Sequence, residues 1–180
     1  EITIKNMSIT AIARKLYFAK RQRELQRHLT HGAEMQRGVL ASLLQRADDT
    51  EYGRNHAFST IRDYETFCAD VPLNDYDSLK QDIDRMRHGE KDVLWPGQVR
   101  WYAKSSGTTN DKSKFIPVSG EGLQRIHYQG GTDTVAFYLM NNPQSRIFDG
   151  KALILGGSHQ ANYNVHGSLV GDLSAILIEN

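Results

Sequence analysis

The sequence predicts an α/β domain in which a helical first half is followed by mixed strands and helices. From Ser8 to about Asp48, apolar residues recur at three- and four-residue steps, which is typical of amphipathic helices. After Gly89 the pattern changes to short segments rich in aromatic and β-branched residues, which favour strands. The length of 180 residues suits one domain with a core of its own. We therefore expect a single unit, mainly helical over residues 1–90 and mixed over residues 91–180.

The first half contains three predicted helical regions. The longest is interrupted near the sequence THGAE, which begins at Thr30. The segment IRDYETFCADVP predicts a short helix that ends before Pro72. The segment LNDYDSLKQDIDRMRHG predicts another helix, with Asn74 or Asp75 as the N-cap and Gly89 as the C-terminal stop. The apolar face of that helix is formed by Leu79, Ile83 and Met86.

The second half alternates between short strands and one longer helix. DVLWPG and VRWYAK are predicted strands joined by a Pro-Gly turn, and KFIPVS is a further strand beyond a serine-rich loop. A helix is predicted over Gly120–Met140, with an interruption at Gly130 and Gly131. KALILGG predicts a compact buried strand, and the polar segment 156–167 follows it.

The composition excludes several classes of function. The chain has 22 basic and 21 acidic residues, so its net charge of +1 gives no general attraction to nucleic acid or an anionic membrane. No window approaches the roughly 18 uninterrupted apolar residues of a membrane span. The single cysteine, Cys68, excludes an internal disulfide framework and a cysteine-based zinc site. We expect a cytoplasmic protein without nucleic-acid or membrane partners, and a buried Cys68 because its neighbours are apolar.

The serine-rich loop has the composition of a phosphate-binding loop. A phosphate group needs several convergent hydrogen-bond donors, a cation, and backbone that can approach it closely. Gly107 permits that approach, and Lys112 and Lys114 supply charge. The hydroxyl donors are Ser105, Ser106, Thr108, Thr109 and Ser113. An ordinary surface turn is the alternative interpretation of the same residues.

The spacing of this loop excludes the two most common phosphate motifs. In a Walker loop the lysine follows the first glycine by six residues, but Lys112 follows Gly107 one place too early, and a strand rather than a helix comes next. The G-x-G-x-x-G fingerprint of dinucleotide-binding folds is absent from the chain. A serine hydrolase with Ser106 as nucleophile is disfavoured because the G-x-S-x-G pattern is missing around it.

Longer strings of residues resemble a known family. The sequence SSGTT, which begins at Ser105 and is followed by a lysine and a short strand, resembles the ATP-phosphate loop of adenylate-forming enzymes, the acyl-CoA synthetase and luciferase-like superfamily. VPLNDYDSLKQDIDRMRHGEKDVLWPG, AKSSGTTNDKSKFIPVS and LILGGSH resemble the bacterial branch of the auxin-responsive-promoter (GH-three) family of acyl acid amido synthetases. The similarity is most specific over Val71–Ser119.

The resemblance implies the fold and the reaction. Residues 1–180 would form a single, incomplete ATP-binding domain, the N-terminal part of the large domain of such an enzyme. ATP would convert a small carboxylic acid to an acyl-adenylate with loss of pyrophosphate, helped by Mg²⁺, and an amino acid would then displace AMP. We expect the chain to need the missing C-terminal part of the same enzyme for activity. The apolar segment Ala175–Ile178, which stops without a cap, also favours a chain cut within a larger fold. The alternative is a catalytically inactive nucleotide-binding or scaffold domain.

The resemblance also implies roles for individual residues. Those assigned to the ATP phosphates are Ser105, Ser106, Gly107, Thr108, Thr109 and Lys114, with Lys114 as the catalytic cation. Asn110 stands where related bacterial sequences usually have glycine, and Asp111 is an unexpected acid beside a phosphate site. Substrate-side roles are assigned to Arg125 and Tyr128, because the helix after the loop partly lines the acyl pocket of the family; placement on the surface is the alternative. His159 is assigned such a role because the polar segment 156–167 follows a predicted buried strand, where ligands of α/β sheets gather, and an ordinary polar connection is the alternative. No residue is assigned to a metal.

Overall fold

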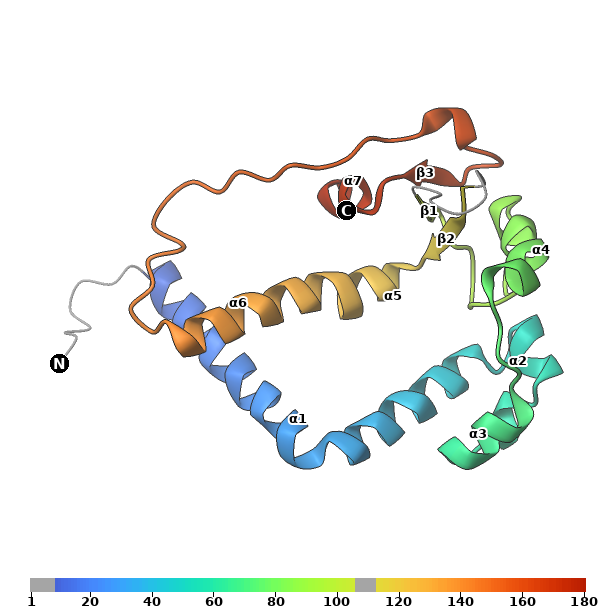
Figure 1. The fold of residues 1–180 in the computed structure, drawn as a ribbon, viewed down its shortest axis with the longest axis horizontal. Helices are drawn as coiled ribbons and strands as arrows, with labels where there is room; N and C mark the ends of the chain where they lie inside the picture. The colour runs from blue at the N-terminus through green and yellow to red at the C-terminus, as the bar shows by residue number, and fades with distance from the viewer. Residues whose placement is uncertain (1–8, 106–112) are drawn as a thin grey trace.

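The computed structural model describes residues 9–105 and 113–180. Its first half is helical, as the sequence predicts (Figure 1). The elements of this half are α1 (Ile9–Ala47), α2 (Glu51–Asn55), the 3-10 turn η2 (Phe58–Thr60), α3 (Tyr64–Asp70) and α4 (Tyr76–Arg87). No helix of the described residues is both long enough and apolar enough to cross a membrane.

The long helix α1 changes direction at one residue. His31 leaves helical geometry, with φ −125° and ψ 21°, and the two halves of α1 meet there at an angle (Figure 1). The hydroxyl of Thr30 lies 2.7 Å from Nδ1 of His31, which gives the polar groups at the kink a local partner. The predicted interruption near THGAE is confirmed.

Helix α4 follows the predicted pattern closely. The carboxylate of Asp75 accepts from the backbone N–H of Ser78, and the hydroxyl of Ser78 accepts from the backbone N–H of Asp75, which forms a capping box. Ile83 and Met86 are buried on the inner face of the helix. Helix α3 ends before Pro72, also as predicted.

Cys68 on α3 is exposed, so the prediction that it is buried is wrong. The reason is that α3 lies on the surface and contains no buried residue. The apolar neighbours of Cys68 in the sequence therefore belong to a short surface helix.

Three short strands form the sheet, in the order β2-β1-β3. The central strand β1 (Trp101–Lys104) runs antiparallel to β2 (Phe115–Val118) and parallel to β3 (Leu169–Gly171). The predicted strand in DVLWPG is wrong, because this segment is a turn in which the carboxylate of Asp92 accepts from the N–H of Gly97 at 2.6 Å.

Side chains of β1 alternate between two clusters of the core. Tyr102 belongs to the cluster that contains Ile83, Met86, Val93, Val99 and Val170. Trp101 belongs to the cluster that contains Val118, Leu123 and Ile176. The strand thus joins α4 on one side to the C-terminal helix α7 (Leu173–Glu179) on the other.

One helical run leads away from β2 towards the start of α1 (Figure 1). It comprises α5 (Gly120–Gly122), the π-helical segment η3 (Leu123–Tyr128) and α6 (Gln129–Asn141). The predicted interruption at Gly130 and Gly131 is wrong, because both residues lie inside α6. The irregular turn comes just before them, in η3.

The predicted buried strand KALILGG is also wrong. Leu153, Ile154 and Leu155 are exposed by 85%, 73% and 84%, and this segment has no regular secondary structure. The third strand of the sheet is formed instead by Leu169–Gly171, which pairs with β1. The chain continues through the turn η4 (Ala161–Tyr163) into β3. The whole is a mixed α/β arrangement, as expected.

Candidate phosphate-binding site

The structure describes both ends of the predicted phosphate loop. Ser105 is the first residue after β1, and Lys114 is the last residue before β2. Ser106, Gly107, Thr108, Thr109, Asn110, Asp111 and Lys112 lie outside the described residues. The geometry of the site is therefore described from Ser105 at one end of the loop and Lys114 at the other.

Two hydrogen bonds hold these ends together. The N–H of Ser105 donates to the carbonyl of Lys114 at 2.9 Å, and the N–H of Lys114 donates to the hydroxyl oxygen of Ser105 at 3.1 Å. A serine hydroxyl that accepts one hydrogen bond can still donate its own proton. Ser105 can thus fix the end of the loop and also offer a donor to a phosphate oxygen.

Lys114 presents a cation beside the loop. Its Nζ lies 5.3 Å from the centroid of the Tyr76 ring, within the range of a cation–π interaction. Among the described residues, no carboxylate lies within ion-pair distance of this amine. Asp75 is nearby, and its pKa is lowered chiefly by the hydrogen bond from the backbone of Ser78, with a smaller contribution from the charge of Lys114. Lys114 is therefore available to an anion.

Two further cations lie at the same end of the sheet, and sequence reasoning missed both. The Nζ of Lys104 lies 4.0 Å from the centroid of the Tyr163 ring, and the guanidinium of Arg87 lies 3.7 Å from that of the Phe115 ring. Arg87 also donates to the carbonyl of Tyr163 at 3.1 Å. Lys104 directly precedes the loop, so its position in YAKSSG was a usable signal.

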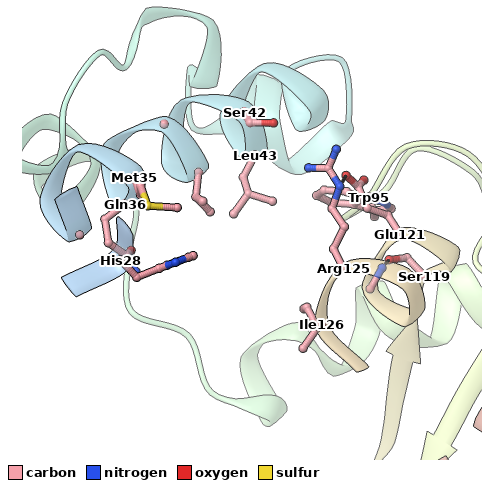
Figure 2. Close-up of a pocket in the computed structure, with 14 residues that line it drawn as sticks. His28, Met35, Gln36, Ser42, Leu43, Trp95, Ser119, Glu121, Arg125 and Ile126 are labelled. Carbon is pink, nitrogen blue, oxygen red and sulfur yellow. Dashed lines mark hydrogen bonds and ion pairs between the residues drawn. The ribbon is translucent and has the colours of Figure 1, made fainter. Parts of the chain in front are cut away.

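Arg125, predicted to contact substrate, lies elsewhere. It pairs with Glu121 at 3.2 Å and borders a cavity of about 840 Å³ between the second half of α1 and the α5–η3 segment (Figure 2). Met35 and Leu43 of α1 and Ile126 of η3 give this cavity an apolar lining (Figure 2).

The cavity lies at the far end of β2 from the loop. Ser119, which follows β2, lines the cavity, whereas Lys114 precedes β2. The four residues of this strand span about 13 Å. Arg125 and Lys114 therefore do not form one site within the described residues.

The other two predicted substrate residues pack against α7. The hydroxyl of Tyr128 donates to the carbonyl of Leu177 at 2.9 Å. The Nε2 of His159 lies 2.9 Å from a carboxylate oxygen of Glu179, and its ring lies 5.6 Å from that of Trp101. The described structure gives both side chains partners in α7 and does not bring them to Lys114.

Acidic and histidine side chains do not gather into a metal site in the described part of the chain. Within these residues, no group of three or more His, Cys, Asp or Glu side chains could hold a metal ion.

Comparison with known proteins places the chain in a family. Residues 21–180 match the model described as the GH3 family N-terminal domain. The chain belongs to the GH3 family. The match includes β1, β2 and the loop between them, so both described ends of the loop lie in the shared domain.

Relatives in the GH3 family have been described in plants. The chain is 33% identical over 97 residues to indole-3-acetic acid-amido synthetase GH3.6 of Arabidopsis thaliana, covering 53% of this chain and 16% of that protein. It is 33% identical over 108 residues to the GH3.5 enzyme of the same plant, covering 59% of this chain and 18% of that protein. The chain thus spans less than a fifth of the length of these relatives.

A solved structure of a GH3 protein has the same fold. The chain superimposes on the AtGH3.15 acyl acid amido synthetase in complex with 2,4-DB with a TM-score of 0.69 and 25% sequence identity. The match covers 89% of this chain and 28% of that one. The arrangement of helices and sheet is therefore that of part of a GH3 acyl acid amido synthetase.

Proposed function

We propose that the full-length protein containing this chain is an ATP-dependent ligase that joins a small carboxylic acid to an amino acid. The observation that carries the proposal is GH3 family membership over residues 21–180, a range that includes the loop between Ser105 and Lys114. The names of the relatives, which are amido synthetases, support the same chemistry. Because the chain spans less than a fifth of GH3.6 and GH3.5, the proposal concerns the whole polypeptide.

In the proposed reaction, a carboxylate oxygen attacks the α-phosphorus of ATP, and pyrophosphate leaves. The acid is then bonded to AMP as an acyl-adenylate. The amino group of the second substrate attacks the acyl carbon, AMP leaves, and an amide bond forms as the nitrogen loses a proton. Both steps concentrate negative charge on phosphate oxygens, so preorganised donors and cations lower their barriers.

The ends of the loop suit that task. Lys114 would neutralise charge on the phosphates, and the hydroxyl of Ser105 would donate to a phosphate oxygen while it fixes the loop. Ser106, Gly107, Thr108 and Thr109 would supply further hydroxyl and backbone donors, as their sequence predicts. Lys104, at the same end of the sheet, would add positive potential.

Mg²⁺ is the ion we propose to accompany ATP. When bound, it would share the charge of the phosphate oxygens, as a hard cation with oxygen ligands does. We propose that the phosphate oxygens of the nucleotide supply most of its ligands. The cytoplasmic location remains a prediction, since it rests only on the cysteine content.

The decisive experiment is ATP–pyrophosphate exchange in the full-length protein with a panel of carboxylic acids. Lys114→Ala is expected to reduce exchange by about 100-fold, the usual scale for removing one group that stabilises transition-state charge. Lys80→Ala is the matched control, because Lys80 is an exposed lysine on α4 and should leave exchange unchanged.

Absence of exchange with every acid, while the wild-type protein still binds ATP, would favour the alternative of an inactive nucleotide-binding or scaffold domain. Equal exchange in the wild type and in Lys114→Ala would instead remove Lys114 from the reaction and leave the ligase activity standing.

A further inference from the structure

Tyr76 contacts the end of the loop in two independent ways. Its hydroxyl oxygen accepts a hydrogen bond from the backbone N–H of Phe115 at 3.0 Å. Its ring lies 5.3 Å from the Nζ of Lys114, the preceding residue. One side chain thus holds both the backbone that follows Lys114 and the charged end of Lys114 itself.

Tyr76 is itself held in place by α4. It is the first residue of that helix, directly after the N-cap Asp75, and it packs against the core cluster around Tyr102. It also lies 39 positions before Phe115 in the sequence. The contact therefore holds the end of the loop in a fixed position relative to the capped helix α4.

A second contact from α4 supports the same strand residue. Arg87, the last residue of α4, places its guanidinium 3.7 Å from the centroid of the Phe115 ring. Phe115 thus contacts residues at both ends of α4, which limits how far β2 can shift relative to the helix. The backbone of Lys114, one residue earlier, is restricted in the same way.

We propose that Tyr76 is a positioning residue for Lys114, an inference that rests on the proposed ligase function. A free lysine side chain samples many rotamers, and ordering it on a phosphate costs conformational entropy. The hydrogen bond to Phe115 fixes the backbone next to Lys114. The face of the Tyr76 ring restricts the positions that the Lys114 amine can occupy. Tyr76 touches neither ATP nor substrate in this proposal.

Two substitutions separate the contributions of the hydroxyl and the ring. Tyr76→Phe removes the hydrogen-bond acceptor and keeps the ring, whereas Tyr76→Leu removes both. The matched control is Tyr64→Leu, because Tyr64 is also the first residue of a helix and also follows an aspartate N-cap, but in the described structure does not contact Lys114. Thermal unfolding of each variant shows whether the fold is retained.

The first readout is spectroscopic and does not depend on activity. Lysine amines of the full-length protein are converted to ¹³C-dimethylamines, and Lys114→Arg identifies the signal of Lys114. We expect an upfield ring-current shift that persists in Tyr76→Phe and in Tyr64→Leu, and is lost in Tyr76→Leu. A Lys114 signal without an upfield shift in the wild type would overturn the proposal.

The second readout is kinetic, in ATP–pyrophosphate exchange. We expect kcat/KM for ATP to fall about fivefold in Tyr76→Phe, the scale of one hydrogen bond, and about 20-fold in Tyr76→Leu. In Lys114→Ala, the further change Tyr76→Leu should have no additional effect. Equal and additive losses in both backgrounds would show that Tyr76 acts on the fold alone and would refute the positioning role.

The two proposals fail in different ways. If Lys114→Ala leaves exchange unchanged, the assignment of Lys114 in the ligase reaction fails. If Lys114→Ala reduces exchange about 100-fold but Tyr76→Leu does not reduce it, only the role of Tyr76 fails.

Discussion

Tyr102, at the centre of β1, is fully buried, yet its hydroxyl has no hydrogen-bond partner among the described residues. The Nε of Arg87 is also buried without a partner in this part of the chain. Burial raises the pKa of Tyr102 to about 12, although the charge of Arg87 acts in the opposite direction. An unpaired buried hydroxyl normally destabilises a fold, so this residue lowers the stability of the core.

Tyr102→Phe tests that interpretation. We expect the free energy of unfolding at pH 7 to rise by about 1 kcal/mol, because the ring stays and an unpaired hydroxyl is removed. Equilibrium unfolding in urea measures the change. A loss of stability would instead show that the hydroxyl has a partner, such as a buried water.

The stability of the wild-type protein and that of Tyr102→Phe should also depend differently on alkaline pH. In the folded protein Tyr102 keeps its proton up to about pH 12, whereas an unfolded tyrosine loses it near pH 10. The wild-type protein should therefore lose stability between about pH 10 and pH 12. Tyr102→Phe should lose less over this window, as measured by urea unfolding at each pH.

At the scale of elements, the close approach of α1 and α2 depends on Gly53. Thr50, the buried N-cap of α2, donates to the carbonyl of Ala47 at 2.6 Å and accepts from the N–H of Gly53 at 2.9 Å. A Cβ on Gly53 would lie 1.9 Å from the carbonyl oxygen of Ala47. The two helices can therefore approach this closely only because Gly53 has no side chain.

Gly53→Ala is expected to lower the free energy of unfolding by more than about 2 kcal/mol, because backbone must move to relieve the clash. Gly38→Ala is the matched control. Gly38 lies inside α1 with nothing within 4 Å of its would-be Cβ, so alanine should raise stability by about 0.5–1 kcal/mol. Urea unfolding of both variants checks the prediction, and equal effects would contradict it.

Elements whose signals are local could be predicted from the sequence. The cap of α4 depends on Asp75 and Ser78, three residues apart, and was therefore visible in the sequence. The segment around Leu153–Leu155 has the composition of a buried strand, but β1 pairs with Leu169–Gly171 instead, and no local pattern in the sequence shows that choice. Contacts such as that of Tyr76 with Phe115 join residues 39 positions apart, so no local pattern shows them.

At the scale of the whole molecule, α1 is tied to the helical run that follows β2 near both of its ends. Near its start, Arg21 binds the carboxylate of Asp133 in α6 through two nitrogens, at 2.6 and 2.9 Å. Near its end, Arg46 pairs with Glu121 of α5 at 2.8 Å. These ion pairs join both ends of the helical run α5–η3–α6 to α1 (Figure 1).

Asp133→Asn tests the first of these connections. The hydrogen bonds from Arg21 lower the pKa of the Asp133 carboxyl below its usual value. Its contribution to stability is therefore complete above about pH 4, the unfolded pKa, and is lost as the pH falls through the folded pKa. We expect the variant to be less stable than the wild type by about 1 kcal/mol at pH 7. This difference should shrink below pH 4 in urea unfolding, and a constant difference would contradict the assignment.

The strand order β2-β1-β3 means that the two neighbours of β1 become available at different times during synthesis on a ribosome. The β1–β2 hairpin can close within about 10 μs once it has emerged. Leu169 of β3 follows Val118 of β2 by about fifty residues, which take roughly 3–10 s to synthesise. For those seconds one edge of β1 has no partner, in a two-stranded ribbon that is only marginally stable. Until β3 arrives, this edge of β1 can therefore pair with a strand of another chain.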